Sequence, residues 1–286
     1  MGYRPIRNSG QLCPLAVRFQ GCPPPAELRE QVQAFWQYDV RAGFDLVPIQ
    51  VFPSGCVVLR FDIGPDGVES VLYPPSASPE MKSVFRRGVS AFGVALRVGR
   101  AFPVLGCTIP ELGATRTRLD AVWARELGLL EERLFLADSF RKRVAVLAEA
   151  LRPASRMPGC GTQNLEHRLD VLLSGSDLRG ALSDRTQRRQ FDRHVGHSPK
   201  QLQRIVRVQA VLRLLSVQPQ SLTRLAHGSG FCDQSHLNRE FVSLLGMTPG
   251  LFRRSLGRFH QTDLPIWADV PILQELRLGP KSDRNF

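Results

Sequence analysis

LTRLAHGSGFCDQSHLNREFVSLLGMTPGLFRR runs from Leu222 to Arg254 and carries the clearest structural pattern in the chain. Within it, residues 234–245 form a short amphipathic pattern whose buried stripe falls on Leu237, Phe241 and Leu244. A glycine at 246 breaks this helix, a threonine follows as an N-cap, and a proline stands in the first turn of the next helix. The pattern predicts two consecutive helices separated by a tight turn.

The same punctuation occurs a second time, 50 residues earlier in the chain. The identical pairs are Arg189 and Arg239, Phe191 and Phe241, Gly196 and Gly246, and Pro199 and Pro249. Because the matches fall on helix, glycine break, cap and proline in one fixed order, a duplicated helical unit explains them better than chance does. The first copy predicts a helix over 186–195, and a longer helix over 199–215, with its own apolar face, joins the two copies.

Positive charge gathers in this duplicated region. The stretch from Arg185 to Arg258 holds 13 basic residues and three acidic ones, a net charge of +10, whereas the part before Pro158 holds 20 basic and 15 acidic residues. Almost all of these cations are arginine, whose planar guanidinium suits forked contacts to phosphates and guanine edges. The composition favours a nucleic-acid partner, although its sign alone also suits RNA or an anionic membrane.

The stretch 222–254 strongly resembles the second helix-turn-helix unit of AraC/XylS-type transcription regulators. The matching motifs are Leu225-Ala226 in the first helix, Gly230-Phe231 at the turn, Asp233-Gln234-Ser235-His236-Leu237 at the start of the recognition helix, and Gly246-x-Thr248-Pro249-x-x-Phe252-Arg253. The first copy, from Ser183, is similar to that family's first unit and linking helix, so the resemblance covers residues 164–255. It implies a sequence-specific regulator, not an enzyme, whose two recognition helices enter successive major grooves of double-stranded DNA.

The resemblance also implies which side chains face DNA. Base contacts fall on Arg185, Thr186, Arg188, Arg189, Gln234, Ser235, His236, Asn238 and Arg239. Phosphate contacts fall on Arg193, Lys200, Arg204, Arg253 and Arg254. Arginine at guanine, and glutamine or asparagine at adenine, are the expected base pairings, each contributing about 1–3 kcal/mol of discrimination. Phosphate contacts position the protein without reading sequence.

The first unit departs from the family pattern. Where the family has a leucine- and alanine-rich helix and a glycine turn, this chain has the glycine-broken stretch 174–180, which has low helix propensity. Gln187 stands where an apolar residue is expected. These departures predict a short or distorted first unit.

The front part of the chain has a different composition. Residues 1 to about 110 are rich in proline and glycine, with short apolar runs such as 49–52, 56–61 and 91–98, which predict strands. From Thr115 the apolar spacing becomes helical and predicts two helices that close this domain. The segment 153–163, with its prolines and glycines, is the expected linker.

These observations predict an α+β chain. We expect a β-rich sensor or dimerisation domain, cupin-like or a small barrel, over 1–152, a linker over 153–163, an all-α domain of two helix-turn-helix units joined by a long helix over 164–258, and an extension over 259–286. The front part is loosely similar to the β-rich domains of some such regulators, through 53–61, 92–99 and 119–123. That similarity implies a small-molecule effector or a homodimer, with RNA polymerase as a further partner.

Patterns for other chemistry are absent from the sequence. Six cysteines form no C-x-x-C pair, and the histidines begin only at His167, so we expect no metal and no cofactor. The sequence contains no G-x-S-x-G, G-x-x-x-x-G-K-[ST] or H-E-x-x-H motif. No apolar run approaches the ~18 residues of a membrane span, and no secretory pattern follows the start. We therefore expect a cytoplasmic, nucleoid-associated protein without a membrane partner.

Two other functions are compatible with the residues at this point. A DNA-modifying or repair enzyme that uses the same helices for targeting would need a reactive cysteine of lowered pKa in the front domain. A nonspecific basic binder would lose affinity for every DNA sequence to the same degree as the salt concentration rises.

Overall fold

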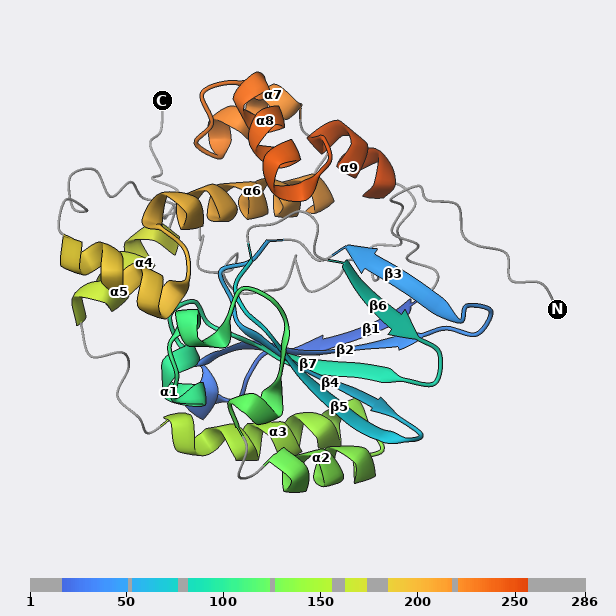
Figure 1. Cartoon of the computed structure of the whole chain (residues 1–286). Coiled ribbons are helices and arrows are strands. Elements are labelled where there is room, and N and C mark those ends of the chain that lie inside the picture. The colour runs from blue at the N-terminus through green and yellow to red at the C-terminus, as the bar shows by residue number, and fades with distance from the viewer. Residues whose placement is uncertain are drawn as a thin grey trace, which may run out of the picture.

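The computed structural model describes residues 17–50, 53–76, 82–123, 127–155, 163–173, 185–217 and 221–256. It has the expected α+β class, with an antiparallel β domain followed by an all-helical C-terminal part (Figure 1). The expected extension over 259–286, the glycine-broken stretch 174–180 and most of the expected linker lie outside the described residues.

The β domain is built on a six-stranded antiparallel sheet in the order β1-β2-β7-β4-β5-β8. Its strands are β1 (Val17–Cys22), β2 (Val32–Val40), β4 (Val58–Gly64), β5 (Gly67–Tyr73), β7 (Ser90–Leu96) and β8 (Thr117–Arg118). A second sheet pairs β3 (Leu46–Gln50) with β6 (Lys82–Arg86). The apolar runs at 49–52, 56–61 and 91–98 contribute to β3, β4 and β7, as short apolar runs between turn signals predict.

The two faces of the six-stranded sheet are covered differently. Helices α2 (Leu127–Leu136) and α3 (Phe140–Ser155) pack on one face, where Phe35, Phe61 and Phe92 form the centre of the main core (Figure 1). On the other face, Trp36 and Tyr38 pack against Phe85 of β6. The domain is therefore a layered structure in which the small sheet covers one side.

The junction after the sheet differs from the prediction. The helical spacing from Thr115 predicts a helix there, but residues 117–118 pair with β5 and a 3-10 turn, η4 (Leu119–Ala121), follows. Leu119 packs into the main core, where it is fully buried. This packing favours the short turn over a continuous helix at this position. The first of the two expected helices is α2, from Leu127, and the second, α3, continues through Pro153 to Ser155.

Three short helical segments complete the β domain: η2 (Ala26–Leu28), α1 (Ala101–Leu105) and η3 (Ile109–Leu112). In η3, the backbone and hydroxyl of Thr108 both donate hydrogen bonds to the Glu111 carboxylate, at 2.5 and 2.7 Å. These bonds lower the pKa of Glu111, and the charge of Arg193 adds to the effect. The η3 turn is thus electrostatically linked to the helical part.

The C-terminal part contains six described helices. They are α4 (Gln163–Leu173), α5 (Arg185–Val195), α6 (Pro199–Val217), α7 (Leu222–Gly228), α8 (Gln234–Leu245) and α9 (Pro249–Leu256). Helices α5, α6 and α8 follow the ranges that the repeat predicts. No helix within the described residues is long and apolar enough to cross a membrane.

The two copies of the repeat fold alike. Gly196 after α5 and Gly246 after α8 both adopt the left-handed conformation, with φ of 73° and 68°. Such a φ ends a helix and is readily adopted only by glycine. Ser198 and Thr248 then accept a backbone hydrogen bond from the residue three positions later, at 3.3 and 3.2 Å. The fixed order of identities in the sequence therefore corresponds to one repeated turn.

The two copies do not share one core. The second copy has its own, in which α6 contributes Ile205, Val208 and Val211, and α8 contributes Leu237 and Phe241. The first copy packs in a separate cluster that includes residues of the β domain as well as α4, α5 and α6. This cluster consists of Cys56, Val98, Leu165, Leu169, Leu172, Leu173, Phe191, Val195, Leu202 and Val206.

Candidate nucleic-acid interface

The second recognition helix, α8, is held rigidly at its start. Asp233 is its N-cap, and one carboxylate oxygen accepts the backbone N–H of His236 at 2.6 Å. Its apolar stripe, with Leu237 and Phe241 fully buried, fixes the helix on α6. Because one face is buried in this way, the opposite face presents polar and basic side chains to solvent.

The exposed face of α8 carries most of the predicted base-reading residues. Gln234, Ser235 and Arg239 are exposed, and Asn238 is half-buried. The Oε1 atom of Gln234 accepts a hydrogen bond from the hydroxyl of Thr223 on α7 at 3.1 Å, so the amide is already oriented. This face offers the donors and acceptors that match base edges in a major groove.

The first recognition helix, α5, is arranged similarly. Phe191 and Val195 are fully buried, whereas Arg185, Arg188 and Arg189 are exposed. The helix includes Thr186 and Gln187, whose side chains lie outside what the structure describes.

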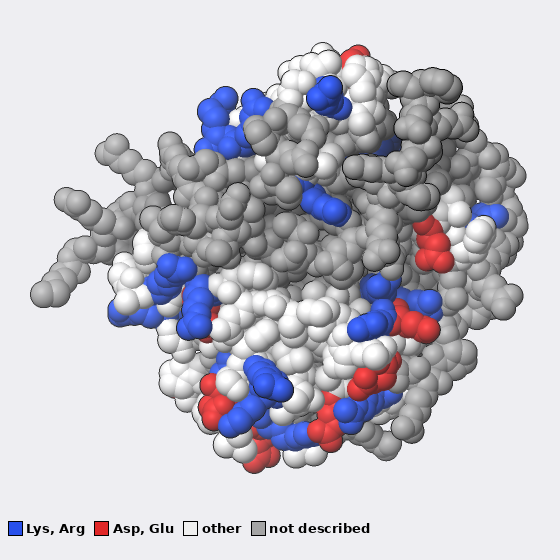
Figure 2. Space-filling view, turned by 180° about the vertical axis from the view of Figure 1, so that it is seen from behind, with Lys and Arg blue, Asp and Glu red and all other residues white. Residues whose placement is uncertain are grey.

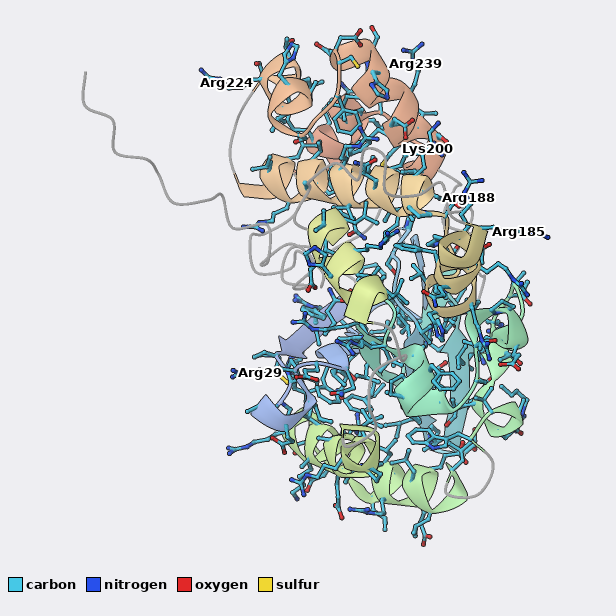
Figure 3. The ribbon with its side chains drawn as sticks, turned by 90° about the vertical axis from the view of Figure 1, so that its left-hand side faces the viewer. Arg29, Arg185, Arg188, Lys200, Arg224 and Arg239 are labelled. Carbon is cyan, nitrogen blue, oxygen red and sulfur yellow. The ribbon has the colours of Figure 1, made fainter. Side chains whose placement is uncertain are left out.

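Several cations from both units lie on a common side of the molecule. Arg185, Arg188, Lys200 and Arg239 all project toward one edge in Figure 3, whereas Arg224 projects the other way. Figure 2, from behind, shows acidic and basic side chains interspersed over the β domain and mostly basic ones over the C-terminal helices. A single duplex along the edge in Figure 3 would meet arginines from both units.

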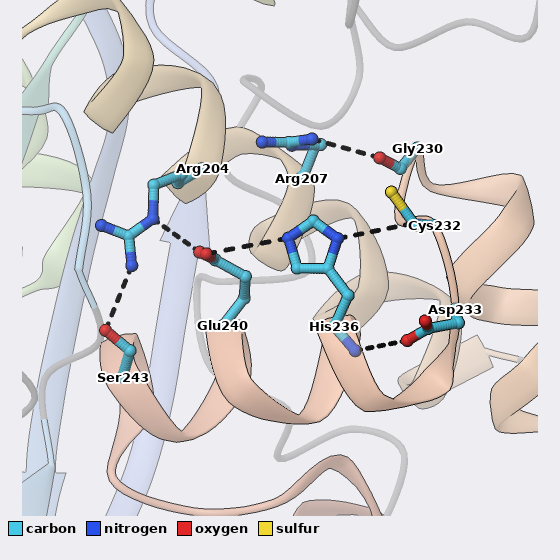
Figure 4. Close-up of polar contacts among 8 residues, drawn as sticks. All are labelled: Arg204, Arg207, Gly230, Cys232, Asp233, His236, Glu240 and Ser243. Atoms are coloured by element: carbon cyan, nitrogen blue, oxygen red, sulfur yellow. Dashed lines mark hydrogen bonds and ion pairs between the residues drawn. The ribbon is translucent and has the colours of Figure 1, made fainter.

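A polar network connects α6 to α8 behind this edge (Figure 4). The Nε atom of Arg204 donates to Glu240 at 2.6 Å, and its Nη2 donates to the hydroxyl of Ser243 at 3.1 Å. The Nδ1 atom of His236 accepts the backbone N–H of Cys232 at 3.4 Å, and its Nε2 lies 3.9 Å from Glu240 Oε1. The network therefore fixes the angle at which α8 packs against α6.

Two predicted DNA contacts, Arg204 and His236, belong to this network. The imidazole of His236 also packs edge-on against Phe231, with ring centroids 5.4 Å apart. The guanidinium of Arg204 is bound to Glu240 and Ser243 on the neighbouring helix. Both side chains thus have partners within the unit, and their contacts to DNA stay predictions. The other predicted phosphate contacts, Arg193, Lys200, Arg253 and Arg254, are exposed.

Sequence reasoning missed Arg207 and Glu240. Arg207 donates from Nη1 to the carbonyl of Gly230 at 3.1 Å and lies over the Phe231 ring, 5.5 Å from its centroid, so it clamps the turn of the second unit. Glu240 is one of only three acids in the basic stretch and lies four residues after His236. An acid at that spacing on a recognition helix is a signal that could have identified the network.

The described cysteines of the β domain lack the environment of reactive thiols. Burial raises the pKa of Cys56 to about 12, against a smaller opposite effect of Arg97. Burial also raises the pKa of Cys22 and of Cys107. A nucleophilic or redox-sensing cysteine requires a lowered pKa, so these three thiols do not support the enzyme alternative. Among the described residues, no group of three or more His, Cys, Asp or Glu could hold a metal ion.

Comparison with known proteins finds two family models that match different parts of the chain. Residues 179–255 match the family model described as a helix-turn-helix domain, and residues 6–118 match a domain family of unknown function. No curated protein matches the chain significantly.

Solved structures of ToxT from Vibrio cholerae are among the structural matches. One, at 9% identity, covers 84% of this chain and 97% of that chain with a TM-score of 0.36. Another, described as bound to an unsaturated fatty acid, has 11% identity, covers 83% of this chain and 94% of that chain, and has a TM-score of 0.35.

Proposed function

We propose that this chain, in which residues 179–255 match a helix-turn-helix domain family, is an AraC-type DNA-binding transcription regulator whose helices α5 and α8 read two successive major-groove segments of one duplex. The observation that carries the proposal is the common side on which Arg185, Arg188 and Arg239 project (Figure 3). On one face of B-DNA the major groove recurs after each helical turn, a distance of about 34–36 Å. Helix α6, which joins the units, fixes their separation because it is continuous over 19 residues.

Base reading is assigned to the exposed faces of the two recognition helices. On α8, Arg239 is suited to guanine and Gln234 or Asn238 to adenine, because these side chains match the edge patterns of those bases. On α5, Arg185, Thr186, Arg188 and Arg189 have the corresponding role. Ser235 and His236 complete the predicted set on α8.

Phosphate binding is assigned to cations that flank these faces. Lys200 stands at the start of α6, Arg193 near the end of α5, and Arg253 and Arg254 in the last turn of α9. Arg204 belongs to the same predicted set. Contacts of this kind fix the register of the protein on the duplex and make binding depend on salt.

The N-terminal part is proposed as the regulatory domain, over residues 1–152, with a linker over 153–163, the DNA-binding domain over 164–258 and an extension beyond. It would bind a small-molecule effector or a second copy of the chain. The protein would act in the cytoplasm at the chromosome, where RNA polymerase is its further partner. The composition of the front part supports this division, while helix α3 runs three residues beyond 152, to Ser155.

Selection of random duplexes by the purified full chain tests the function. Sequencing the enriched DNA should reveal two conserved blocks whose centres lie about 10–10.5 bp apart, one for each unit. A competition assay at rising salt is the control, since a specific binder keeps its preference for the selected site over competitor DNA. Enrichment of a single block, or equal loss of selected and competitor DNA, would contradict the proposal.

A further inference from the structure

The first recognition helix packs on the β domain as well as on its own unit. Phe191 and Val195 of α5 share a core with Cys56 and Val98 of the β domain, and all four are buried. Helix α5 also lies against η3 of that domain. Among the residues that the structure describes, the core of the second recognition helix contains residues from α6 to α9 and the loops between them, and none from the β domain.

The contact surface, here called the interdomain seam, is lined by glycines at its closest points. A methyl group on Gly55 would lie 2.8 Å from Cδ1 of Leu202, and one on Gly99 would lie 2.6 Å from Cδ1 of Leu169. From the other side, a methyl group on Gly196 would lie 2.5 Å from Cγ2 of Ile109. At distances below about 3 Å the neighbouring side chain must shift to admit a methyl group, so the backbone of one surface lies directly against the side chains of the other.

Polar contacts also cross the seam. The amide of Gln209 on α6 donates to the carbonyl of Pro53 at 2.9 Å. The ring of His197, which is buried, hydrogen-bonds to the backbone of Ser54, and the ring of His194 packs edge-on against Phe102 of α1. The seam therefore has both the packing and the hydrogen bonds of a specific interface.

From this arrangement we infer that the β domain is a positioning surface for α5, so that reading of the first DNA block depends on the seam while reading of the second does not. The inference rests on the proposed function, because it presupposes that each recognition helix reads one block. Val98 shares a core with α5, Ile109 meets the turn after α5, and Gly55 meets Leu202 of α6 in that same core. All three are therefore positioning residues, since they reach DNA only through the first unit. Displacement of α5 by even a small distance would misalign its arginines with the base edges.

Substitution of Gly55 by valine tests the inference in the full chain. The backbone of Gly55 lies outside the left-handed region, so a side chain strains only the seam and not the main chain. In a footprint on the selected DNA, Gly55→Val should lose protection of the α5 block and keep protection of the α8 block. Affinity should fall at least about tenfold, the factor that corresponds to one bidentate base contact.

Three further variants make the result specific. Arg189→Ala identifies the α5 block, because it weakens only the contacts of that helix. Gly55→Val combined with Leu202→Ala removes the nearest atom that the new side chain meets, while the methyl groups of Val98 at 3.1 and 3.5 Å remain, and should restore part of the protection of the α5 block. Gly128→Ala is the matched control, since a methyl group there meets nothing within 4 Å. Thermal unfolding of each variant shows whether it is folded.

The outcomes separate the inference from the function. A wild-type chain that protects one block or none contradicts the proposed function. If the wild type protects both blocks and folded Gly55→Val does so too, or loses both equally, the inference alone is wrong. A lost α5 block that the double variant does not restore also overturns it. Should Gly55→Val fail to fold, Gly55→Ala takes its place and is judged by the same criteria.

Discussion

Arg239 and Lys200 are exposed on the same side of the molecule but offer different chemistry to DNA. The guanidinium of Arg239 is a planar fork on a recognition helix, whereas the ammonium of Lys200 is a point charge in the first turn of α6. A fork matches the O6 and N7 atoms of guanine, and a point charge matches any phosphate. The two residues should therefore affect specificity and affinity separately.

Replacing Arg239 by alanine should reduce the preference for the selected site by about 1–3 kcal/mol and relax the sequence read at one position. Replacing Lys200 by alanine should instead weaken binding to selected and unrelated DNA alike. Shift assays with both DNA types at one salt concentration measure the difference. Equal weakening of every DNA by both substitutions would show that α8 is misassigned.

The histidines of the interdomain seam make stability depend on pH. Burial lowers the pKa of His197, against the opposing effect of its hydrogen bond to Ser54, and burial also lowers the pKa of His194. Above the ordinary pKa of about 6.5 both are neutral in folded and unfolded chains. As the pH falls through that value, the unfolded chain binds protons first, so the free energy of unfolding should fall by up to about 1.4 kcal/mol per pH unit and per proton.

Urea unfolding between pH 8 and pH 5 measures this dependence. His197→Gln should flatten the slope below pH 6.5 and leave it unchanged above, because a glutamine keeps a hydrogen-bond donor but does not titrate. The remaining slope belongs to His194. A variant as sensitive to acid as the wild type would show that the His197 ring is not buried at the seam.

At the scale of elements, the tie between α6 and α8 is the clearest feature. Arg204 and Glu240 join the two helices by an ion pair whose side chains are 28% and 18% exposed. Hydrogen bonds to charged groups contribute about 1.5–3 kcal/mol when both partners are present. The pair therefore helps to hold α8 in place on α6.

Replacing Arg204 by methionine separates a positioning role from phosphate binding. If the Glu240 contact dominates, the free energy of unfolding should fall by about 1.5–3 kcal/mol. The dependence of DNA affinity on salt should then stay as in the wild type. If Arg204 binds a phosphate, the slope of the logarithm of affinity against the logarithm of salt should decrease by about one. Lys200→Met, which lies outside the network, is the control and should change only the slope.

The helices of the repeat could be predicted from the sequence because specific residue types mark where each helix ends and the next begins. Gly196, Gly246 and the prolines that follow restrict the backbone locally, so the bounds of α5, α6 and α8 follow from a few positions. The partners of His236 and Arg204 could not be predicted in the same way. A basic residue of a helix-turn-helix unit looks the same in sequence whether its side chain points at DNA or at an acid of the same unit.

The same limit applies at the turn after the sheet. The spacing around Leu119 is helical, yet residues 117–118 add an edge strand, because a backbone next to an open strand gains hydrogen bonds there. Such pairing depends on distant residues that no local pattern contains. For the whole molecule, the interdomain seam was likewise hidden, since Gly55 and Gly99 look like ordinary turn glycines in the sequence.

For the molecule as a whole, the two helix-turn-helix units differ in what stabilises them. The second has a core of its own, and the first shares one with the β domain. Regions that share a core tend to open together, and regions with separate cores open separately. The chain should therefore behave as two cooperative units whose boundary does not coincide with the linker.

Amide hydrogen exchange on the full chain measures this division. The amides of α5 should exchange in step with those of β4 and β7, whereas the amides of α8 should exchange at an independent rate. Mild urea should change the α8 rate without changing that of α5, or the reverse. Exchange of α5 and α8 in step with each other, apart from the sheet, would contradict the division.

Helix α6 belongs to both cores, through Leu202 and Val206 at one end and Val211 and Leu215 at the other. A continuous helix transmits angle as well as distance, at about 100° for each residue. One residue inserted in its middle would therefore swing the second unit a quarter-turn or more around the rod and aim its arginines away from the duplex. The relative orientation of the two units thus depends on the number of residues in this helix, which should tolerate insertion far less than a surface loop does.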